Sequence, residues 1–403
     1  MIRDVGTEYD VIVAGAGPAG SSAAKVLADR GWKTLCVDRR SFPRHKVCGE
    51  FMSPEARRTL QEMRLLDAVR ELEPALIEQA VIVTGRRSAV KMPLPEPAYG
   101  ISRFALDAAL HEAAVRSGAK LLPGTIVTRV DREGEAYAVE MRRGKETANV
   151  RAKAVIAAWG NRSRIVNREN RGNLEAGNAY IGLKCHLTGI DPGSSVELYL
   201  MPGGGYIGIA PVERGIVNLA GLLPNGAEEG NDPSWSAGGT KAGEARTSAY
   251  AGTAAGRLLA AAMRHPVLAK RLRGASPVPQ SDAAVYPVIL DRRPRLWEDY
   301  PCIGDAGLMI PPLCGDGMSI AFYTAKICGD ITHRYLSGDL DAEGWRREYE
   351  RAASAAVNRP LYWGRLLHEC SRFSRAAGPL ASFFRSFPAL ARMLLRATRL
   401  DIR

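Results

Sequence analysis

Apolar and polar positions near the start of the chain follow two different spacings. Residues 9–14 and 33–37 are short apolar runs of the length of buried strands. Between them, small and apolar residues continue at helical spacing through Leu27, after a glycine-rich break that marks a tight turn. The pattern predicts a strand, a turn, a helix and a second strand parallel to the first.

Later segments repeat both patterns. An amphipathic helix is expected after Arg103 and a strand at about 125–130, while a short strand leads into Gly304 and a glycine-rich turn opens a helix at Gly317. Other stretches alternate in strand fashion, such as "AYIGLKCHL", "SSVELYLMP", "YIGIAPVE" and "GIVNLAGLL". These elements predict an α/β protein with one Rossmann-type sheet and one mixed β-sheet.

The predicted domains are discontinuous, as expected for a chain of 403 residues with room for two cores. The Rossmann-type domain takes residues 1–75, 100–165 and 285–345. The mixed-sheet domain takes residues 76–99 and 166–284, with a Gly-, Ala- and Ser-rich loop at 224–256. Residues 346–403 form a helical C-terminal tail, interrupted near Gly378-Pro379 and Pro388.

Charge distinguishes this tail from the rest of the chain. The net charge is +12, and residues 351–403 contain ten arginines but only two acids, Glu369 and Asp401. The tail could pack on the domain, or it could make peripheral contact with anionic lipid at the inner membrane face. No nucleic-acid motif accompanies the charge, so nucleic acid is not an expected partner.

The remaining composition points to the cytoplasm. The first strand begins at about Tyr9, which leaves no room for a signal peptide, and no run of 18 uncharged apolar residues spans a membrane. Seven scattered cysteines show no CxxC pair and no spacing that would ligate a metal, so no metal is expected.

The first turn has the residues that hold a dinucleotide. Gly15-x-Gly17-x-x-Gly20, with Pro18 and Ala19 between the last two glycines, allows a tight turn, close approach of a pyrophosphate and helix–strand packing. The helix N-terminus favours phosphate. Asp38 ends the second strand 18 residues after Gly20, where it can bind ribose hydroxyls, and Arg39 follows it.

The C-terminal half resembles the second flavin motif of the glutathione-reductase-type FAD enzymes, particularly the p-hydroxybenzoate-hydroxylase-like group. The resemblance lies in "CIGDAGLMIPPLCGDGMSIAF". It implies that Gly304 and Asp305 hold the ribityl chain, and that Gly315, Gly317 and Met318 lie at the flavin N1–C2=O edge. It also implies that Arg103 lies beside the cofactor and that the Val127 backbone contacts adenine.

The stretch Pro43-x-x-Lys46-x-Cys48-Gly49 resembles a signature of the geranylgeranyl reductase family, which uses FAD to saturate isoprenoid double bonds. The resemblance implies that this loop, with Cys48 and Gly49, lies over the flavin and that Cys48 faces substrate. Cys48, Lys46 and Tyr206 are the catalytic candidates, and His45 and Glu50 are flanking acid/base candidates. Packing, proton donation and thiol exchange remain open for Cys48.

Two departures limit the resemblance. The family's YxWxFP motif keeps Tyr206 and Pro211, but Gly208 and Ala210 replace its bulky residues, so a wider pocket is expected. Trp159 replaces an aspartate associated with NADPH use in the hydroxylases, and it could pack in the core or stack near the cofactor.

The favoured function is an FAD-dependent oxidoreductase that transfers hydride from reduced flavin to a C=C bond of a hydrophobic small molecule, with NAD(P)H as the expected electron donor. The first alternative is a monooxygenase that hydroxylates an aromatic or polyketide substrate through a C4a-hydroperoxyflavin. The second is an electron-transfer flavoprotein partner that docks through the basic tail. Reduction and hydroxylation cannot be separated by these residues, and the substrate is open.

Overall fold

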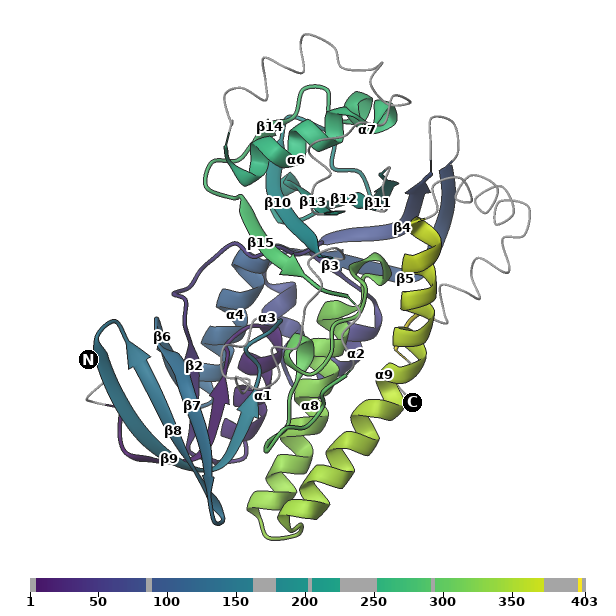
Figure 1. Cartoon of the computed structure of the whole chain (residues 1–403). Coiled ribbons are helices and arrows are strands. Elements are labelled where there is room, and N and C mark those ends of the chain that lie inside the picture. The colour runs from purple at the N-terminus through teal and green to yellow at the C-terminus, as the bar shows by residue number, and fades with distance from the viewer. Residues whose placement is uncertain are drawn as a thin grey trace.

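The computed structural model describes residues 5–84, 89–161, 179–201, 205–224, 252–290, 294–372 and 398–400. Within these residues the strands form a six-stranded sheet and a nine-stranded sheet, which lie in different parts of the molecule (Figure 1). The six-stranded sheet has the order β6-β2-β1-β9-β8-β7. Its strands are β1 (Glu8–Ala14), β2 (Thr34–Asp38), β6 (Lys120–Pro123), β7 (Ile126–Glu133), β8 (Ala136–Arg143) and β9 (Glu146–Ala157).

The predicted N-terminal unit is confirmed. Strands β1 and β2 are parallel and paired in register from Val11 to Ala14, and α1 (Pro18–Ala28) connects them. Helix α4 (Arg103–Arg116) begins at the expected arginine, and α8 (Gly317–Leu336) begins at the expected glycine-rich turn. The segment before Gly304 differs from the prediction, because it makes a single parallel bridge from Cys302 to Ala157 rather than a strand.

The second sheet has the order β14-β10-β13-β12-β11-β4-β5-β3, with β15 paired to β10 off this path. Its strands are β3 (Phe51–Met52), β4 (Ala75–Val83), β5 (Ala89–Gly100), β10 (Tyr180–Thr188), β11 (Ser195–Leu200), β12 (Tyr206–Pro211), β13 (Val217–Pro224), β14 (Ser276–Pro277) and β15 (Ala283–Val288). Parallel pairing of β4 with β11 amid antiparallel neighbours makes the sheet mixed, as predicted. The domain boundaries stay a prediction.

The two faces of the second sheet have different neighbours. Helices α6 (Ala254–Met263) and α7 (Pro266–Arg271) cover one face, where Leu183 and Cys185 of β10 join their core. Because successive strand residues point to opposite faces, Gly182, Lys184 and His186 point the other way, toward the first domain. Short helices α2 (Glu55–Glu62) and α3 (Leu66–Arg70) follow β3 and pack with α4 and α8.

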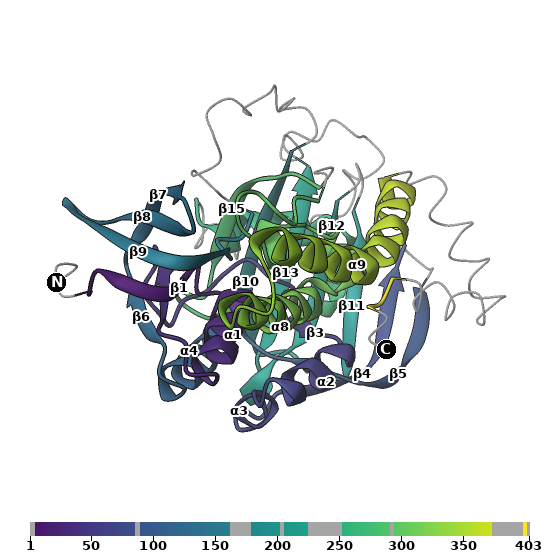
Figure 2. The ribbon, with the colours of Figure 1, turned by 90° about the horizontal axis from the view of Figure 1, so that it is seen from below.

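Helix α9 (Ala342–Arg372) packs along α8 and then continues toward strands β4 and β11 of the second sheet (Figures 1 and 2). Its buried side chains, including Trp345, Tyr349 and Val357, belong to the core that also contains β1 and α1. This part of the predicted tail therefore packs on the domain. The predicted breaks at 378–379 and 388, and nearly all of the predicted loop 224–256, lie outside the described residues.

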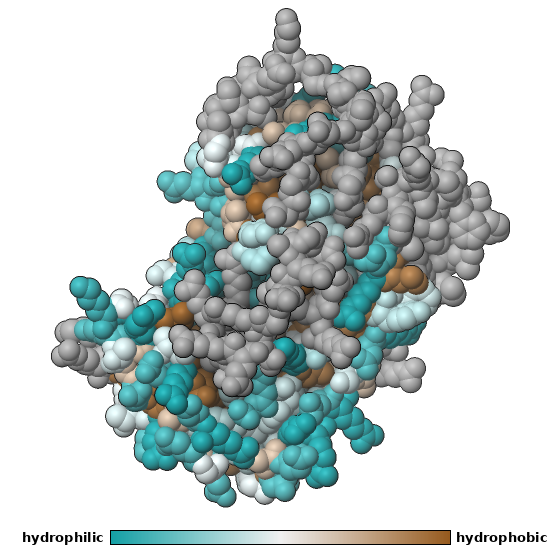
Figure 3. All heavy atoms as spheres, viewed as in Figure 1, coloured by the Kyte–Doolittle hydropathy of each residue, from teal (hydrophilic) through white to brown (hydrophobic). Residues whose placement is uncertain are grey.

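Within the described part of the chain, none of the helices combines the length and apolar character needed to cross a bilayer. On the face drawn in Figure 3, hydrophobic residues appear as small separate patches among hydrophilic ones. On α9, Tyr362 and Leu366 stand four residues apart and are exposed.

Candidate active site

Three glycines at the start of α1 divide into two that the fold requires and one that faces open space. An added Cβ on Gly20 would overlap the Gly15 carbonyl, and one on Gly15 (φ +113°) would overlap the Ala158 carbonyl. An added Cβ on Gly17 would meet only the Arg103 Nη2 atom, at 3.6 Å. Gly17 is also the N-cap of α1 and provides no side-chain cap, so free N–H groups face that space.

This division predicts different results for two alanine variants. Gly20→Ala is expected to lose 4 kcal/mol or more of folding free energy, on the order of the largest single-site effects. Gly17→Ala is expected to unfold at nearly the wild-type urea concentration but to bind FAD about tenfold or more weakly, because a methyl group would stand where a pyrophosphate must approach. Urea unfolding and FAD titration of both proteins check this. Equal FAD affinity in Gly17→Ala and wild type would contradict the placement.

Asp38, the predicted ribose ligand, already accepts hydrogen bonds at both of its carboxylate oxygens. Its carboxylate accepts the backbone N–H groups of Ala16 (2.9 Å) and Arg40 (2.8 Å) and a two-pronged bond from Arg44 (2.8 and 3.1 Å). Burial alone would raise the pKa of Asp38, but these donors lower it below the ordinary value. Ribose hydroxyls could reach both oxygens only with displacement of Arg44, so the predicted role of Asp38 stays a prediction.

Other predicted adenosine-side residues lie near Asp38. Arg39 is exposed beside it. Val127 is buried in β7. Just before this strand, the Thr125 backbone N–H donates to the Asp38 carbonyl at the end of β2 (2.9 Å). Trp159 packs edge-on against Tyr300, with ring centroids 5.9 Å apart, which favours the packing interpretation of this residue.

Two cationic side chains, Arg103 and Lys46, lie near the N-termini of α1 and α4. Arg103 makes a buried two-pronged ion pair with Asp107 (2.7 and 2.8 Å), which outweighs the effect of burial and raises the pKa of Arg103. The Lys46 ammonium lies near Gly160, and burial together with the Arg103 charge lowers the pKa of Lys46. Asp305, which is exposed, opposes that shift. The Lys46 ammonium therefore lies on the predicted phosphate and ribityl side, and its predicted catalytic role stays a prediction.

The second glycine-rich turn lies against the first. Gly304 (φ +55°) would place a Cβ 3.0 Å from the Ala19 Cβ, so close contact with α1 requires glycine there. An added Cβ on Gly317 would meet nothing within 4 Å, and α8 has no side-chain cap at its N-terminus. Gly315 has a left-handed φ of +71° and lies against Phe51, while Met318 is buried.

Asp316, the N-cap residue of α8, has a partner from a distant part of the chain. Arg399 donates to its Oδ1 atom at 2.8 Å, and the guanidinium also lies over the Phe51 ring. Oδ2 of Asp316 is buried without a hydrogen-bond partner among the described residues. Burial raises the pKa of Asp316 to about 6, although Arg399 opposes the rise.

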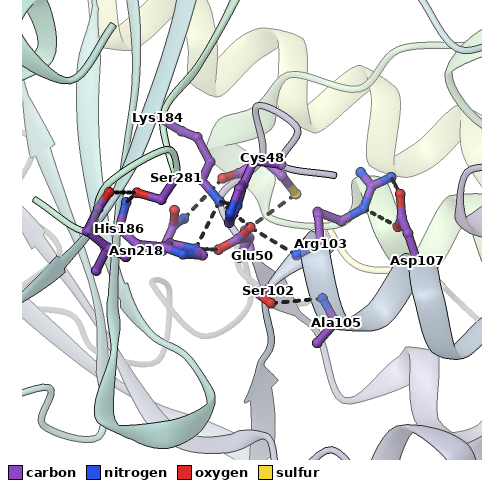
Figure 4. A network of polar contacts seen from close by, with 12 residues as sticks. Cys48, Glu50, Ser102, Arg103, Ala105, Asp107, Lys184, His186, Asn218 and Ser281 are labelled. Atoms are coloured by element: carbon purple, nitrogen blue, oxygen red, sulfur yellow. Dashed lines mark hydrogen bonds and ion pairs between the residues drawn. The ribbon is translucent and has the colours of Figure 1, made fainter. Parts of the chain in front are cut away.

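The cysteine loop lies between the first domain and the second sheet (Figure 4). Cys48 is partly buried, its Sγ accepts the Glu50 N–H at 3.4 Å, and its carbonyl accepts the Asn218 side-chain amide at 3.0 Å. An added Cβ on Gly182 of β10 would come within 3.0 Å of Val47, so this part of the loop packs closely on the sheet. Gly49 faces open space.

Glu50 is the centre of a buried polar cluster that the sequence did not reveal. Its Oε1 accepts hydrogen bonds from the Lys184 ammonium (2.6 Å) and from the backbone N–H of Arg103 (2.9 Å). Its Oε2 lies 2.6 Å from His186 Nε2 (Figure 4). Lys184 also lies 2.9 Å from His186 Nε2 and 3.4 Å from His45 Nδ1. Two polar residues at i and i+2 of an otherwise apolar strand, "GLKCH", were the signal that could have identified them.

Tyr206 lies on the same sheet face. Three rows of side chains cross β10, β13 and β12 there: Gly182–Leu222–Tyr206, Lys184–Ala220–Gly208 and His186–Asn218–Ala210. Tyr206 is buried with apolar neighbours, its hydroxyl has no hydrogen-bond partner among the described residues, and burial raises its pKa well above the ordinary value. Gly208 and Ala220 are partly exposed.

The expected widening of the pocket applies to one of the two substituted positions. Gly208 is partly exposed and has only ordinary contacts around an added Cβ, at 3.7 Å or more. Ala210 is instead buried against Phe51, Ile77 and Ala98. The structure therefore leaves accessible space beside Gly208, while other side chains fill the space at Ala210.

The residues present fit a bound FAD. Two helix N-termini without side-chain caps, each with a glycine that faces open space, suit the negative charges of a pyrophosphate and of a reduced flavin edge. Arg103, beside Gly17, and Lys46, beside Gly160, add positive charge near the start of α1. A nucleotide-binding sheet with these two helix starts, closed on one side by a mixed sheet, defines an FAD-dependent oxidoreductase of the glutathione-reductase and p-hydroxybenzoate-hydroxylase type.

Comparison with known proteins narrows the class to a family. Residues 8–220 match a family model described as "FAD binding domain", which covers more than half of the chain, and the chain belongs to that family. The menaquinone reductase of Mycolicibacterium smegmatis is 33% identical over 166 residues, which are 40% of this chain and 39% of that protein. The chain thus matches about two fifths of the length of this relative.

Longer matches have lower identity. A digeranylgeranylglycerophospholipid reductase of Methanopyrus kandleri is 26% identical over 351 residues, 85% of this chain and 81% of that protein. A geranylgeranyl bacteriochlorophyll reductase-like structure from Thermoplasma acidophilum has a TM-score of 0.71 at 21% identity, covering 93% of this chain and 91% of that chain. A flavin-dependent brominase has a TM-score of 0.75 at 18% identity, with coverage of 97% and 93%. These structural likenesses show the fold.

Proposed function

We propose that this protein is an FAD-dependent reductase that saturates a C=C bond in an isoprenoid-like hydrophobic substrate, with NAD(P)H as electron donor. The single observation that carries the proposal is the position of Cys48. Its loop runs from Lys46, beside Arg103 in the first domain, to the second sheet, where Gly208 and Ala220 are partly exposed. Two relatives, a menaquinone reductase and a digeranylgeranylglycerophospholipid reductase, support reduction of an isoprenoid-like molecule.

The substrate is proposed to lie on the sheet face around Gly208 and Ala220. Leu198 and Leu200 of β11 continue this face, are partly exposed and supply apolar contacts. Tyr206 closes one end of it, and its buried hydroxyl could donate a hydrogen bond to an oxygen of the substrate head group. Such a surface suits a long apolar chain better than a charged molecule.

Residues of the first domain are proposed to hold the cofactor. Backbone N–H groups at the start of α1, with Arg103 and Lys46 nearby, bind the pyrophosphate, and Asp305 binds the ribityl chain. Reduced FAD, when held there, would supply the hydride for one alkene carbon. The Cys48 thiol donates its proton to the neighbouring carbon, becomes a thiolate and regains a proton from solvent.

Turnover of a Cys48→Ala variant tests the proposal. We expect it to bind FAD normally but to reduce geranylgeraniol about 100-fold more slowly, because positioned acids contribute two to four orders of magnitude. The reaction is run without oxygen, and mass spectrometry detects the two added hydrogens per double bond. Tyr206→Phe serves as a matched variant, expected to raise KM more than it lowers kcat. A wild-type rate in Cys48→Ala would remove the thiol from the reaction.

A monooxygenase is the second candidate function, because the chain shares its fold with a flavin-dependent brominase. The two functions differ in their products. Incubation of the FAD-loaded protein with NAD(P)H, air and an aromatic or polyketide substrate should give a product heavier by one oxygen atom only if the protein is a monooxygenase. The ten arginines of residues 351–403 also keep membrane contact of the basic tail as a proposal. Residues 373 to 397 of this tail lie outside the described structure.

A further inference from the structure

The cluster of Glu50, Lys184 and His186 lies next to Cys48 but offers no exposed reactive group. All three side chains are at most 5% exposed, and Glu50 and Lys184 are fully buried. A buried ion pair is weak evidence for stability, because desolvation of both charges offsets much of their attraction. The position of this cluster therefore calls for an explanation other than stability.

The backbone of Glu50 provides one. Its φ of +54° lies in the left-handed region, which costs a residue with a side chain about 1 kcal/mol or more. This conformation directs the Glu50 N–H to the Cys48 Sγ atom. Such strain persists only where the surroundings fix the residue. Here the carboxylate is held by Lys184 and His186 of β10, and by the first N–H of α4.

The same cluster joins the two domains at this point. The Glu50 carbonyl accepts the Ile101 N–H at 3.0 Å, and the Arg103 N–H bond caps the start of α4. His186 is fixed in turn, since its backbone N–H donates to the Ser281 hydroxyl at 3.0 Å. On the far side of the cysteine, Asn218 holds the Cys48 carbonyl. Cys48 is thus held at two atoms: Asn218 bonds its carbonyl, and the N–H of Glu50 bonds its Sγ atom.

The cluster is closed to solvent and pairs the Glu50 carboxylate with the Lys184 ammonium. Hydrogen bonds and charges from His186 and Lys184 outweigh burial and lower the pKa of Glu50, so the carboxylate is ionised at neutral pH. His45 borders the cluster and stacks on Phe104, and burial with the Lys184 charge lowers the pKa of His45 to about 4. His45 is therefore neutral at pH 7 and adds no second positive charge.

We propose that Glu50, Lys184 and His186 are positioning residues, which hold the Cys48 thiol at the boundary between the flavin domain and the substrate-binding sheet. The catalytic part of this inference rests on the proposed function. The positional part does not, because it concerns where the thiol is held in the folded protein. Loss of the cluster is expected to release the loop and to increase the exposure of Cys48.

The reactivity of Cys48 toward iodoacetamide measures that position directly. Cys36, Cys185, Cys302, Cys314 and Cys328 are buried, and mass spectrometry of the Cys48 peptide follows Cys48 separately from every other cysteine. Lys184→Met leaves the Glu50 carboxylate buried without its counter-charge and could fail to fold. The double variant Glu50→Gln/Lys184→Met removes both charges of that ion pair and nearly keeps the side-chain volumes. We expect it to fold, to bind FAD and to alkylate Cys48 at least fivefold faster than wild type.

A second ion pair in the same sheet provides the matched control. Arg271 of α7 bonds Glu197 of β11 at 2.9 Å, away from the loop, so Glu197→Gln/Arg271→Met should leave the alkylation rate within twofold of wild type. A folded Glu50→Gln/Lys184→Met protein with an unchanged alkylation rate would overturn the proposal and leave the cluster as a tie between domains.

Turnover separates this inference from the proposed function. If Cys48 is the acid, the double variant should lower kcat for geranylgeraniol reduction about tenfold with little change in KM, and its pH–rate profile should shift. If Cys48→Ala turns over at the wild-type rate while the double variant still alkylates faster, the thiol is positioned but is not the acid. In that outcome the proposed function fails and the positional inference stands.

Discussion

Asp305→Ala is expected to yield a folded protein that is purified with little or no FAD. The side chain is exposed at the short turn Gly304–Ala306, so its loss should change the free energy of unfolding by no more than about 0.5 kcal/mol. The same carboxylate acts electrostatically on Lys46 and Arg103 and is the predicted partner of the ribityl hydroxyls. Removal of that partner should weaken FAD binding about 100-fold, as expected for loss of two charge-assisted hydrogen bonds.

The measurement is the flavin absorbance released per mole of purified protein, followed by FAD titration of the apoprotein. Asp339→Ala is the control, since Asp339 is also exposed but follows α8 at its opposite end. Full FAD occupancy in Asp305→Ala would show that the second glycine-rich turn does not hold the ribityl chain. A large loss of stability would instead indicate a structural role.

Arg399→Met is expected to destabilise the protein in a pH-dependent manner. Without Arg399, the Asp316 carboxylate is buried without a counter-charge, and Glu55 and Ser53 are its remaining polar neighbours. At pH 8 the loss should be about 3 kcal/mol, the usual result of breaking a buried ion pair. At pH 5 the loss should be much smaller, because Asp316 can be protonated.

The direction of this pH dependence follows from the pKa of Asp316 in the unfolded and in the folded protein. The ordinary carboxyl pKa is 3.8, that of Asp316 in the folded protein is about 6, and removal of Arg399 raises it further. Between these values the folded state binds more protons than the unfolded state, so stability falls as pH rises. Urea unfolding at pH 5 and pH 8 tests this. An equal loss at both pH values would contradict it, and Asp316→Asn/Arg399→Met should remove the pH dependence.

Local signals explain what the sequence could predict. The turn at Gly15 and Gly20, the start of α4 at Arg103 and the start of α8 at Gly317 each depend on residues close together in the chain. Glycines at fixed spacing and an apolar run before them determine such elements almost independently of the remaining fold. The class of nucleotide-binding sheet follows from these elements.

Long-range pairs could not be predicted in the same way. Glu50 and Lys184 are 134 positions apart, and Asp316 and Arg399 are 83 apart, with no sequence pattern that links the partners. Glu50 was proposed as a flanking acid/base group, and its ion pair depends on how β10 is placed against the loop. The position of the Lys46 ammonium beside Gly160 depends on the same kind of packing, and the predicted catalytic role of Lys46 stays a prediction.

The contact between Arg399 and Asp316 has a consequence for how the protein is made. The ribosome adds Arg399 83 residues after Asp316, a delay on the order of ten seconds at ordinary rates of translation. During that interval the start of α8 has no guanidinium beside its N-cap carboxylate. The Asp316 carboxylate must therefore be protonated, or the surface around Phe51 and Gly315 must stay hydrated. Final packing of this helix start is therefore a late event in the biosynthesis of the chain, well after the first sheet can form.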